Sequence, residues 1–397
     1  MRIKTLLLWL VFVVGMCGKL PVHASGLMQD SIRISLVTCA PGSEIYALFG
    51  HSAIRYENYT RRQDLVFNYG MFSFNTPNFV MRFLMGKTDY QLGVVPYSHF
   101  EMEYAMRGSD VYQQVLNLTQ EEKVRLVMLL DENYHPSNRT YRYNYFYDNC
   151  TTRARDKIEE CLNGSVSYPE DVPSCSFRDI IHEFTAGNAW SELGIDLCLG
   201  AEADVPLDYR KQQFAPFKML SSARKATLSR SESVTSYIES EHVRKAEVIR
   251  DHSEGFPLSP LACANILLGI TLTVAVWSYK VGRVCWLWDV LLYGLQGLGG
   301  CIIAFLFFFS VHPTVGSNWM LVLFNPLPLC YLPMMVYKAV KRKKDFYHAL
   351  NVVYLTLFII AMPFIPQYFN ATVLPLTLSL LVCSAGHLFL YRSKRFK

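Results

Sequence analysis

Residues 141–153 have the sequence YRYNYFYDNCTTR, and this stretch decides which fold class we expect. The aromatic run predicts a strand or loop that ends at Asp148 or Asn149, and either of these residues is a good helix N-cap. Residues 150–162 have helical character, so Cys150 falls in the first turn of a predicted helix. A helix N-terminus favours negative charge and therefore lowers the pKa of a thiol toward the reactive thiolate.

A second stretch, TCAPGSEIYALFGHSAIRY at residues 38–56, predicts a histidine at the end of a sheet. Residues 32–37 alternate apolar and polar side chains, which indicates a strand, and residues 53–69 predict a two-stranded hairpin. His51 would lie at the open end of the first strand, directly after Gly50, where the missing side chain lets backbone or ligand approach closely. Taken alone, His51 is more simply explained as a hydrogen-bonded structural histidine.

Together the two stretches predict a nucleophilic site. A cysteine that opens a helix, with a histidine on a neighbouring strand, resembles the arrangement of papain-type enzymes. Here the histidine comes first in the chain, as in circularly permuted papain-like folds such as that of lecithin retinol acyltransferase. Counting back from a turn near Thr60 places Asn68 beside His51, so Asn68 is the predicted orienting residue and Asp64 the second choice. A structural role for Asn68, capping backbone at the strand end, is an equal alternative.

The first 24 residues predict a secretory signal peptide. Arg2 and Lys4 precede an apolar stretch at residues 6–14, and Val22-His23-Ala24 fits the small-x-small cleavage pattern. An uncleaved anchor is the alternative, and in either case the following segment lies outside the cytoplasm, where disulfides form. A structural disulfide is therefore an even alternative for Cys150. The other cysteines of the same segment are Cys39, Cys161, Cys175 and Cys198.

Composition divides the chain into a soluble and a membrane part. Hydrophobic residues make up 51% and charged residues 18% of the chain, which excludes a disordered chain and a simple soluble domain. The net charge of +5 is too small to imply a nucleic-acid partner. We expect an extracytoplasmic catalytic domain over residues 25–220, a polar helical linker over 221–256 and a membrane domain over 257–397.

Five apolar segments of the membrane part each have about the length that a hydrocarbon core of roughly 30 Å requires. Lys and Arg cluster in alternate loops, which predicts that the N-terminal domain lies outside and the C-terminus inside. Three prolines interrupt the third segment and predict a broken helix there. We expect His312 and Asn318 to lie in an uncharged outer loop that faces the catalytic domain, where they could contact lipid headgroups. The predicted spans are residues 261–279, 285–309, 319–337, 347–365 and 373–390.

Cofactor motifs give no positive prediction. The chain has no Walker A loop and no GxGxxG dinucleotide fingerprint, which argues against ATP and NAD. Its eleven cysteines form no CxxC pair, so no zinc or iron–sulfur spacing is present. We therefore expect neither a cofactor nor a metal.

Longer strings resemble one bacterial family. The chain is similar to the Lnb family of lipoprotein N-acyltransferases over most of residues 30–216, and its membrane half resembles the transmembrane domain of that family. The strings that carry the resemblance are TCAPGSEIYALFGHSAIRY, FNYGMFSF, LMGKTDYQL, LNLT, NRTYRYNYFYDNCTTRARD, FSVHPTVGSNW and FNPLP.

The resemblance implies an activity and two lipid partners. A membrane phospholipid would donate an acyl chain to the α-amino group of a diacylglyceryl-modified cysteine, in a multi-pass protein of the bacterial inner membrane with its N-terminal domain in the periplasm. Cys150 would carry the acyl chain as a thioester, with His51 as acid and base and Asn68 orienting His51. The residues that could bind lipid phosphate are Arg153, Arg55 and Arg139, with solvated surface charge as the alternative for each.

Two competing functions stay open. The same thioester could be passed to water, which would make the protein a membrane-anchored cysteine hydrolase that cleaves phospholipids or cell-wall peptides. Alternatively, the soluble domain could be a non-catalytic, disulfide-stapled binding module. A further set of side chains could line an acyl groove or simply belong to the core: Met71, Phe72, Phe74, Phe79, Met81, Phe83 and Met85.

Overall fold

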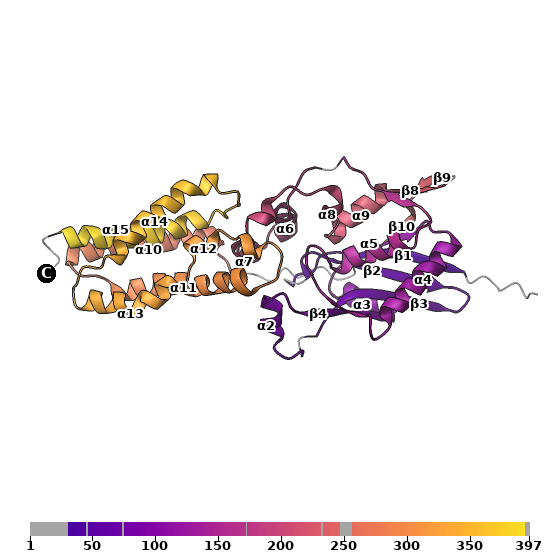
Figure 1. Cartoon of the computed structure of the whole chain (residues 1–397), viewed down its shortest axis with the longest axis horizontal. Helices are drawn as coiled ribbons and strands as arrows, with labels where there is room; N and C mark the ends of the chain where they lie inside the picture. The colour runs from indigo at the N-terminus through magenta and orange to yellow at the C-terminus, as the bar shows by residue number, and fades with distance from the viewer. Residues whose placement is uncertain are drawn as a thin grey trace, which may run out of the picture.

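The computed structural model describes residues 31–44, 47–73, 75–171, 173–231, 233–246 and 256–393. The predicted signal peptide, residues 1–24, lies outside this part of the chain. Figure 1 shows two bodies arranged end to end, a mixed α/β domain and a bundle of long helices.

The centre of the N-terminal domain is a seven-stranded sheet in which every described pairing is antiparallel. Strands β2 and β3 form the predicted hairpin, with Ile54 opposite Phe67. In sheet order the strands are β10 (Ile238–Arg244), β5 (Val111–Leu116), β1 (Ile32–Cys39), β2 (His51–Asn58), β3 (Gln63–Met71), β4 (Asp89–Pro96) and β6 (Thr140–Arg142).

Helices cover both faces of this sheet because its strands bury apolar side chains on both sides. On one face, side chains such as Ile34 and Ile54 pack with α4 (Gln120–Tyr134), α5 (Cys150–Glu160) and α9 (Pro216–Lys225). On the other face, Val37 and Ala53 pack with α3 (Tyr97–Met106). The predicted α+β class, with the histidine strand before the cysteine helix, is confirmed.

The prediction of a helical linker over residues 221–256 is wrong in its described part. Helix α9 continues to Lys225, and three strands follow it. Strand β10 pairs with β5 and so completes the main sheet, while β8 (Thr227–Arg230) lies between β9 (Ser233–Ser236) and β7 (Ser165–Ser167) in a small second sheet. Most residues of these strands are half-buried or exposed, and few of them are large and apolar, which gave the segment the composition of a linker.

Within the described ranges, five helices are long and apolar enough to cross a membrane, as predicted. The third is broken between Leu323 and Leu327, where Pro326 cannot continue the helix. The elements are α10 (Pro260–Val281), α11 (Trp286–Phe309), α12 (Met320–Leu323) with α13 (Leu327–Val340), α14 (Tyr347–Ala361) with the 3-10 turn η4 (Met362–Phe364), and α15 (Val373–Arg392).

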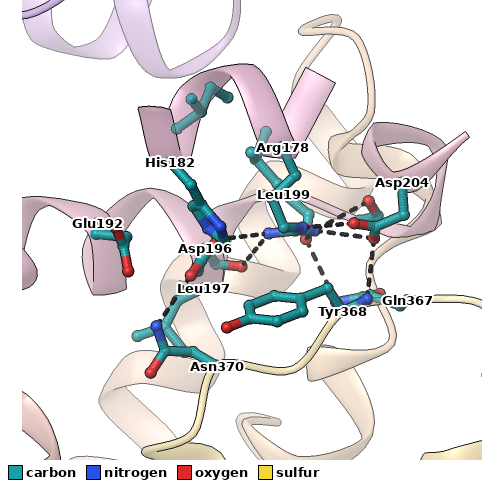
Figure 2. A network of polar contacts seen from close by, with 12 residues as sticks. Arg178, His182, Glu192, Asp196, Leu197, Leu199, Asp204, Gln367, Tyr368 and Asn370 are labelled. Atoms are coloured by element: carbon teal, nitrogen blue, oxygen red, sulfur yellow. Dashed lines mark hydrogen bonds and ion pairs between the residues drawn. The ribbon is translucent and has the colours of Figure 1, made fainter. Parts of the chain in front are cut away.

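A polar network joins the two bodies (Figure 2). Buried Arg178 on α6 (Phe177–Thr185) donates to Asp196 of α7 (Ala189–Cys198) at 2.8 Å and to Asp204 at 2.7 Å. From the loop between α14 and α15, the Asn370 amide donates to Asp196 at 3.0 Å. The backbone N–H of Tyr368 donates to Asp204 at the same distance. The N-terminal domain is thus docked on one end of the helical bundle.

His312 and Asn318, expected in an outer loop that faces the N-terminal domain, both bind that domain. His312 Nε2 donates to the carbonyl oxygen of Phe83 at 2.7 Å. Buried Asn318 donates from Nδ2 to the carbonyl oxygen of Leu197 at 2.8 Å.

Candidate active site

The side chain of the N-cap residue Asn149 holds the start of α5. Its Oδ1 accepts the backbone N–H groups of Thr151 and Thr152 at 2.8 and 3.0 Å. Its Nδ2 donates to the carbonyl oxygens of Tyr145 and Phe214 at 2.8 and 2.9 Å. Because Asn149 is buried, these four bonds fix the first turn of the helix and the residue that follows the cap.

That next residue is Cys150, and the strands place His51 and Asn68 beside it. His51 opens β2, and its Nε2 lies 2.6 Å from Oδ1 of Asn68 on β3. Gly70, two residues after Asn68 on β3, has a φ of 85° and lies at a bulge of this strand. A Cβ atom on Gly70 would lie 3.7 Å from Cβ of Cys150 and 4.0 Å from Cε1 of His51. The three predicted site residues therefore come together in the structure.

The contact with Asn68 selects the tautomer of the His51 ring. An amide oxygen can only accept a hydrogen bond, so Nε2 of His51 carries a proton and donates it to Asn68. The other ring nitrogen, Nδ1, is then free to take the thiol proton of Cys150. Tyr104 on α3 stacks on the ring at 6.0 Å between centroids and 9° between planes, which limits its rotation.

The thiol of Cys150 is poised to ionise. Burial acts to raise the pKa of this thiol, but the charge and hydrogen bond of His51, together with the Ser52 backbone and the Thr151 hydroxyl, lower it to about 7. Burial acts to lower the pKa of His51, but the neighbouring Cys150 thiolate and the Asn68 contact raise it overall. Both shifts favour a thiolate–imidazolium pair.

The other cysteines of this domain behave in the opposite way. All ten cysteines in the described part of the chain are free thiols. Burial raises the pKa of each remaining described thiol in the N-terminal domain, so Cys150 alone among them is activated. These unactivated thiols are Cys39, Cys161, Cys175 and Cys198.

Comparison with known families accounts for both bodies of the chain. Residues 24–183 match the Lnb N-terminal periplasmic domain, and residues 251–394 match the Lnb transmembrane domain.

The chain belongs to the Lnb family.

No curated protein and no solved structure gives a match to this Lnb chain. The order of the two matched domains is the order of the two bodies in the structure. The chain is accordingly a multi-pass membrane protein with a β-rich N-terminal domain.

Two of the three arginines predicted to bind phosphate are occupied within the fold of this Lnb protein. Arg153 forms two hydrogen bonds with Asp148, at 2.6 and 2.7 Å, and lies over the ring of Tyr141. Arg55 forms two bonds with Asp64, at 2.9 and 2.8 Å, and one with Gln113 at 2.8 Å. Their side chains therefore support the structure, which the sequence could not show because both partners depend on the fold.

Arg139, the third of these arginines, stands before β6. Its backbone carbonyl accepts the N–H of Leu92, and no contact joins it to the site residues within the described ranges.

Of the backbone N–H groups at the start of α5, those of Thr151 and Thr152 donate to the Asn149 cap. The aromatic run supplies another donor that the sequence did not single out. The hydroxyl of Tyr145 is buried without a hydrogen-bond partner, and burial and the nearby Cys150 thiolate raise its pKa. It is a neutral O–H donor beside the nucleophile.

Two groups of side chains could hold a metal ion by geometry. Donor atoms of Asp289, Cys383 and His387 lie within 4.8 Å of one another in the membrane domain. Both Cys383 and His387 already hydrogen-bond to Oδ1 of Asp289, at 3.2 and 3.0 Å. The second group, His182, Glu192 and Asp196, lies beside the Arg178 cation, which disfavours another positive charge (Figure 2). Both groups are distant from Cys150 in the sequence.

Proposed function

We propose that this Lnb protein is a lipoprotein N-acyltransferase of the bacterial inner membrane. It transfers an acyl chain from a membrane phospholipid to the α-amino group of a diacylglyceryl-cysteine. The observation that carries the proposal is the activated Cys150 thiol, paired with His51 and Asn68 in a domain docked on membrane spans.

The first half-reaction loads the enzyme. Nδ1 of His51 takes the thiol proton, and the Cys150 thiolate attacks the carbonyl carbon of a phospholipid ester. A C–S bond forms, and the ester C–O bond breaks when the tetrahedral intermediate collapses. His51 returns its proton to the departing alkoxide, so the products are a thioester on Cys150 and a lysophospholipid. The Cys150 N–H and the Tyr145 hydroxyl would stabilise the oxyanion.

The second half-reaction unloads the enzyme onto the lipoprotein. The neutral α-amine attacks the thioester carbon, a C–N bond forms and the C–S bond breaks. His51 takes a proton from the attacking nitrogen and returns it to the sulfur, which restores the thiol. Nothing is oxidised or reduced, so acid–base groups are sufficient.

Membrane attachment fits this pair of substrates. Both are held in the bilayer, and the five spans keep the catalytic domain at the same surface, which raises the effective concentration of each substrate. The strand end that carries His51 and Cys39 is the end from which α2 and the α6–α7 region reach the bundle. The site is therefore on the membrane side of the catalytic domain.

The burial of Cys150 supports an amine rather than water as acceptor. The residue is only 8% exposed, so a thioester there is shielded from bulk water. The Cys150 thiol is free and has a lowered pKa, which argues against a binding module stapled by a disulfide at this residue.

The test uses the full chain in phosphatidylethanolamine vesicles that contain a diacylglyceryl lipopeptide. We expect mass spectrometry to find an acyl-thioester on the Cys150 peptide when lipopeptide is absent, and N-acylated lipopeptide when it is present. Cys150→Ser should abolish both products, whereas Cys175→Ser, which changes another free thiol of the domain, should retain both. Full activity of Cys150→Ser, or release of free fatty acid with no N-acylated product, would overturn the proposal.

A further inference from the structure

Helix α2 (Phe79–Leu84) is apolar but unburied. Its sequence is FVMRFL, and none of its six residues is buried. Val80 is 69%, Met81 48% and Phe83 47% exposed. A cluster of exposed apolar side chains of this kind marks a surface that another apolar phase covers.

The position of α2 identifies that phase. The backbone N–H of Val311, just after the outer end of α11, donates to the carbonyl oxygen of Met85 at 3.0 Å. The ring of Phe83 lies 5.7 Å from that of His312. The last residues of α11, Phe308 and Phe309, are themselves exposed, as lipid-facing residues of a span would be. Figure 1 shows α2 beside this end of α11, at the boundary of the two bodies.

Basic groups lie on and next to α2. Arg82 and Arg142 both pair with one carboxylate, Asp89, at 2.7 and 2.8 Å, which leaves a net positive charge. Lys87 is exposed next to them. Cations beside an apolar helix are typical of a segment that lies in the headgroup region of a bilayer.

A row of aromatic rings leads from α2 to the nucleophile. Neighbouring centroids are separated by 6.1 Å for Phe83–Phe79, 5.7 Å for Phe79–Phe72, 5.0 Å for Phe72–Tyr90 and 4.2 Å for Tyr90–Tyr143. Tyr143 then reaches the site, because a Cβ on Gly70 would lie 3.9 Å from Cε2 of Tyr143 and 3.7 Å from Cβ of Cys150.

We propose that α2 lies in the outer headgroup region and that this aromatic row binds the acyl chain of a bilayer phospholipid on its way to Cys150. The acyl chain passes over α2 and along the rings. The basic groups on and next to α2 meanwhile hold the phosphate of the same phospholipid near the membrane surface. The route to Cys150 rests on the proposed acyl transfer, whereas the contact of α2 with lipid does not.

Photocrosslinking tests the lipid contact without relying on catalysis. A p-benzoylphenylalanine placed at Val80 in the full chain, in vesicles of phosphatidylethanolamine and phosphatidylglycerol, should form phospholipid adducts on illumination. The matched control is Val234 on β9, which is also 69% exposed but lies at the end of the molecule away from the spans (Figure 1). Adducts at Val80 and none at Val234 support the proposal, and equal yields or no adduct at Val80 would overturn it.

Kinetics test the route along the rings. Phe79→Ser should lower the rate of thioester formation from bilayer phospholipid by about tenfold, because it removes one apolar contact of the chain. The rate with water-soluble p-nitrophenyl butyrate, which needs no acyl route, should stay unchanged. Met102→Ser, at an exposed apolar residue of α3, should change neither rate.

An unchanged rate with bilayer phospholipid in Phe79→Ser, or an equal loss with both donors, would overturn the acyl route. A failure of the proposed thioester chemistry would look different, because wild-type protein would then form no thioester on Cys150 with either donor. Transfer of the acyl chain to water would be seen as free fatty acid without N-acylated lipopeptide, while the effect of Phe79→Ser on thioester formation remained.

Discussion

Burial and the neighbouring charge of His51 shift the pKa of the Cys150 thiol in opposite directions. Replacing His51 with Ala removes the charge and the hydrogen bond that lower the thiol pKa, while burial remains. The pKa should therefore rise from about 7 to beyond the ordinary thiol value. We expect the rate of Cys150 alkylation by iodoacetamide to increase with pH. The pH midpoint of this increase should lie near 7 in wild type and much higher in His51→Ala.

Mass spectrometry of the Cys150 peptide gives these rates, and Cys175 in the same digest is the internal control. Burial raises the pKa of the Cys175 thiol, so its alkylation should need a higher pH in both proteins. An identical midpoint for Cys150 with and without His51 would contradict the pairing. In the intact enzyme, acyl transfer should increase as pH rises through about 7 and decrease above the raised pKa of His51.

Asn68 is expected to act through the ring of His51. Asn68→Ala removes the acceptor of the Nε2 proton and should lower kcat about 10- to 100-fold, with KM little changed. Asn68→Asp keeps an acceptor and adds a negative charge, so it should retain more activity. It should also move the alkaline decrease of the pH profile upward, since a carboxylate raises the pKa of the histidine. Equal activity of the two variants would show that Asn68 is only structural.

A substitution at Tyr145 should change activity without changing stability. Its hydroxyl is buried without a partner, so Tyr145→Phe removes an unsatisfied group and should not destabilise the protein. If that hydroxyl stabilises the oxyanion, kcat should nevertheless fall about 100-fold. Tyr147→Phe, at a half-exposed neighbour, is the control and should change neither property. A decrease in melting temperature together with the decrease in activity would contradict a role of the Tyr145 hydroxyl in stabilising the oxyanion.

At the scale of elements, local signals predicted α5 and the β2–β3 hairpin because each is encoded by its own residues. Asn149 caps the helix directly, and we expect Asn149→Ala to cost about 2 kcal/mol or more, since it removes the cap and leaves two buried carbonyls without their donor. Asn188 stands at the same N-cap position of α7 but makes no side-chain cap bond. Asn188→Ala should therefore have little effect, and equal losses in thermal or denaturant unfolding would contradict the capping argument.

Other elements could not be predicted because their partners are distant in sequence. Strand β10 is recognisable only once it pairs with β5, since its own side chains are mostly polar. Arg55 and Arg153 have the positive charge that a phosphate site needs, but in the folded protein they pair with Asp64 and Asp148. The Asn68 position was predictable because the hairpin turn fixes the count of residues back to His51.

At the scale of the whole molecule, the docking of the two bodies depends on buried amides that bind backbone carbonyls. Asn318 donates to Leu197 O and accepts from the Gln367 amide and the Met320 N–H. We expect Asn318→Ala to loosen this docking, which hydrogen–deuterium exchange would record as faster uptake in α7. Activity with bilayer phospholipid should fall while activity with p-nitrophenyl butyrate persists.

Asn325→Ala is the control for this experiment, because the Asn325 amide bonds to Val322 O within the membrane domain. Unchanged exchange of α7 in Asn318→Ala, or faster exchange in both variants, would contradict a specific docking role.

Strand β10 has a practical consequence for anyone who wishes to isolate the N-terminal domain. A fragment cut after residue 220, where the composition changes, would lose β10 and turn β5 into an edge strand, because β5 would then be paired only with β1. Such strands pair readily with copies of themselves, so we expect that fragment to aggregate. A fragment that runs to residue 246 keeps β5 covered and is the better starting point for work in detergent-free solution.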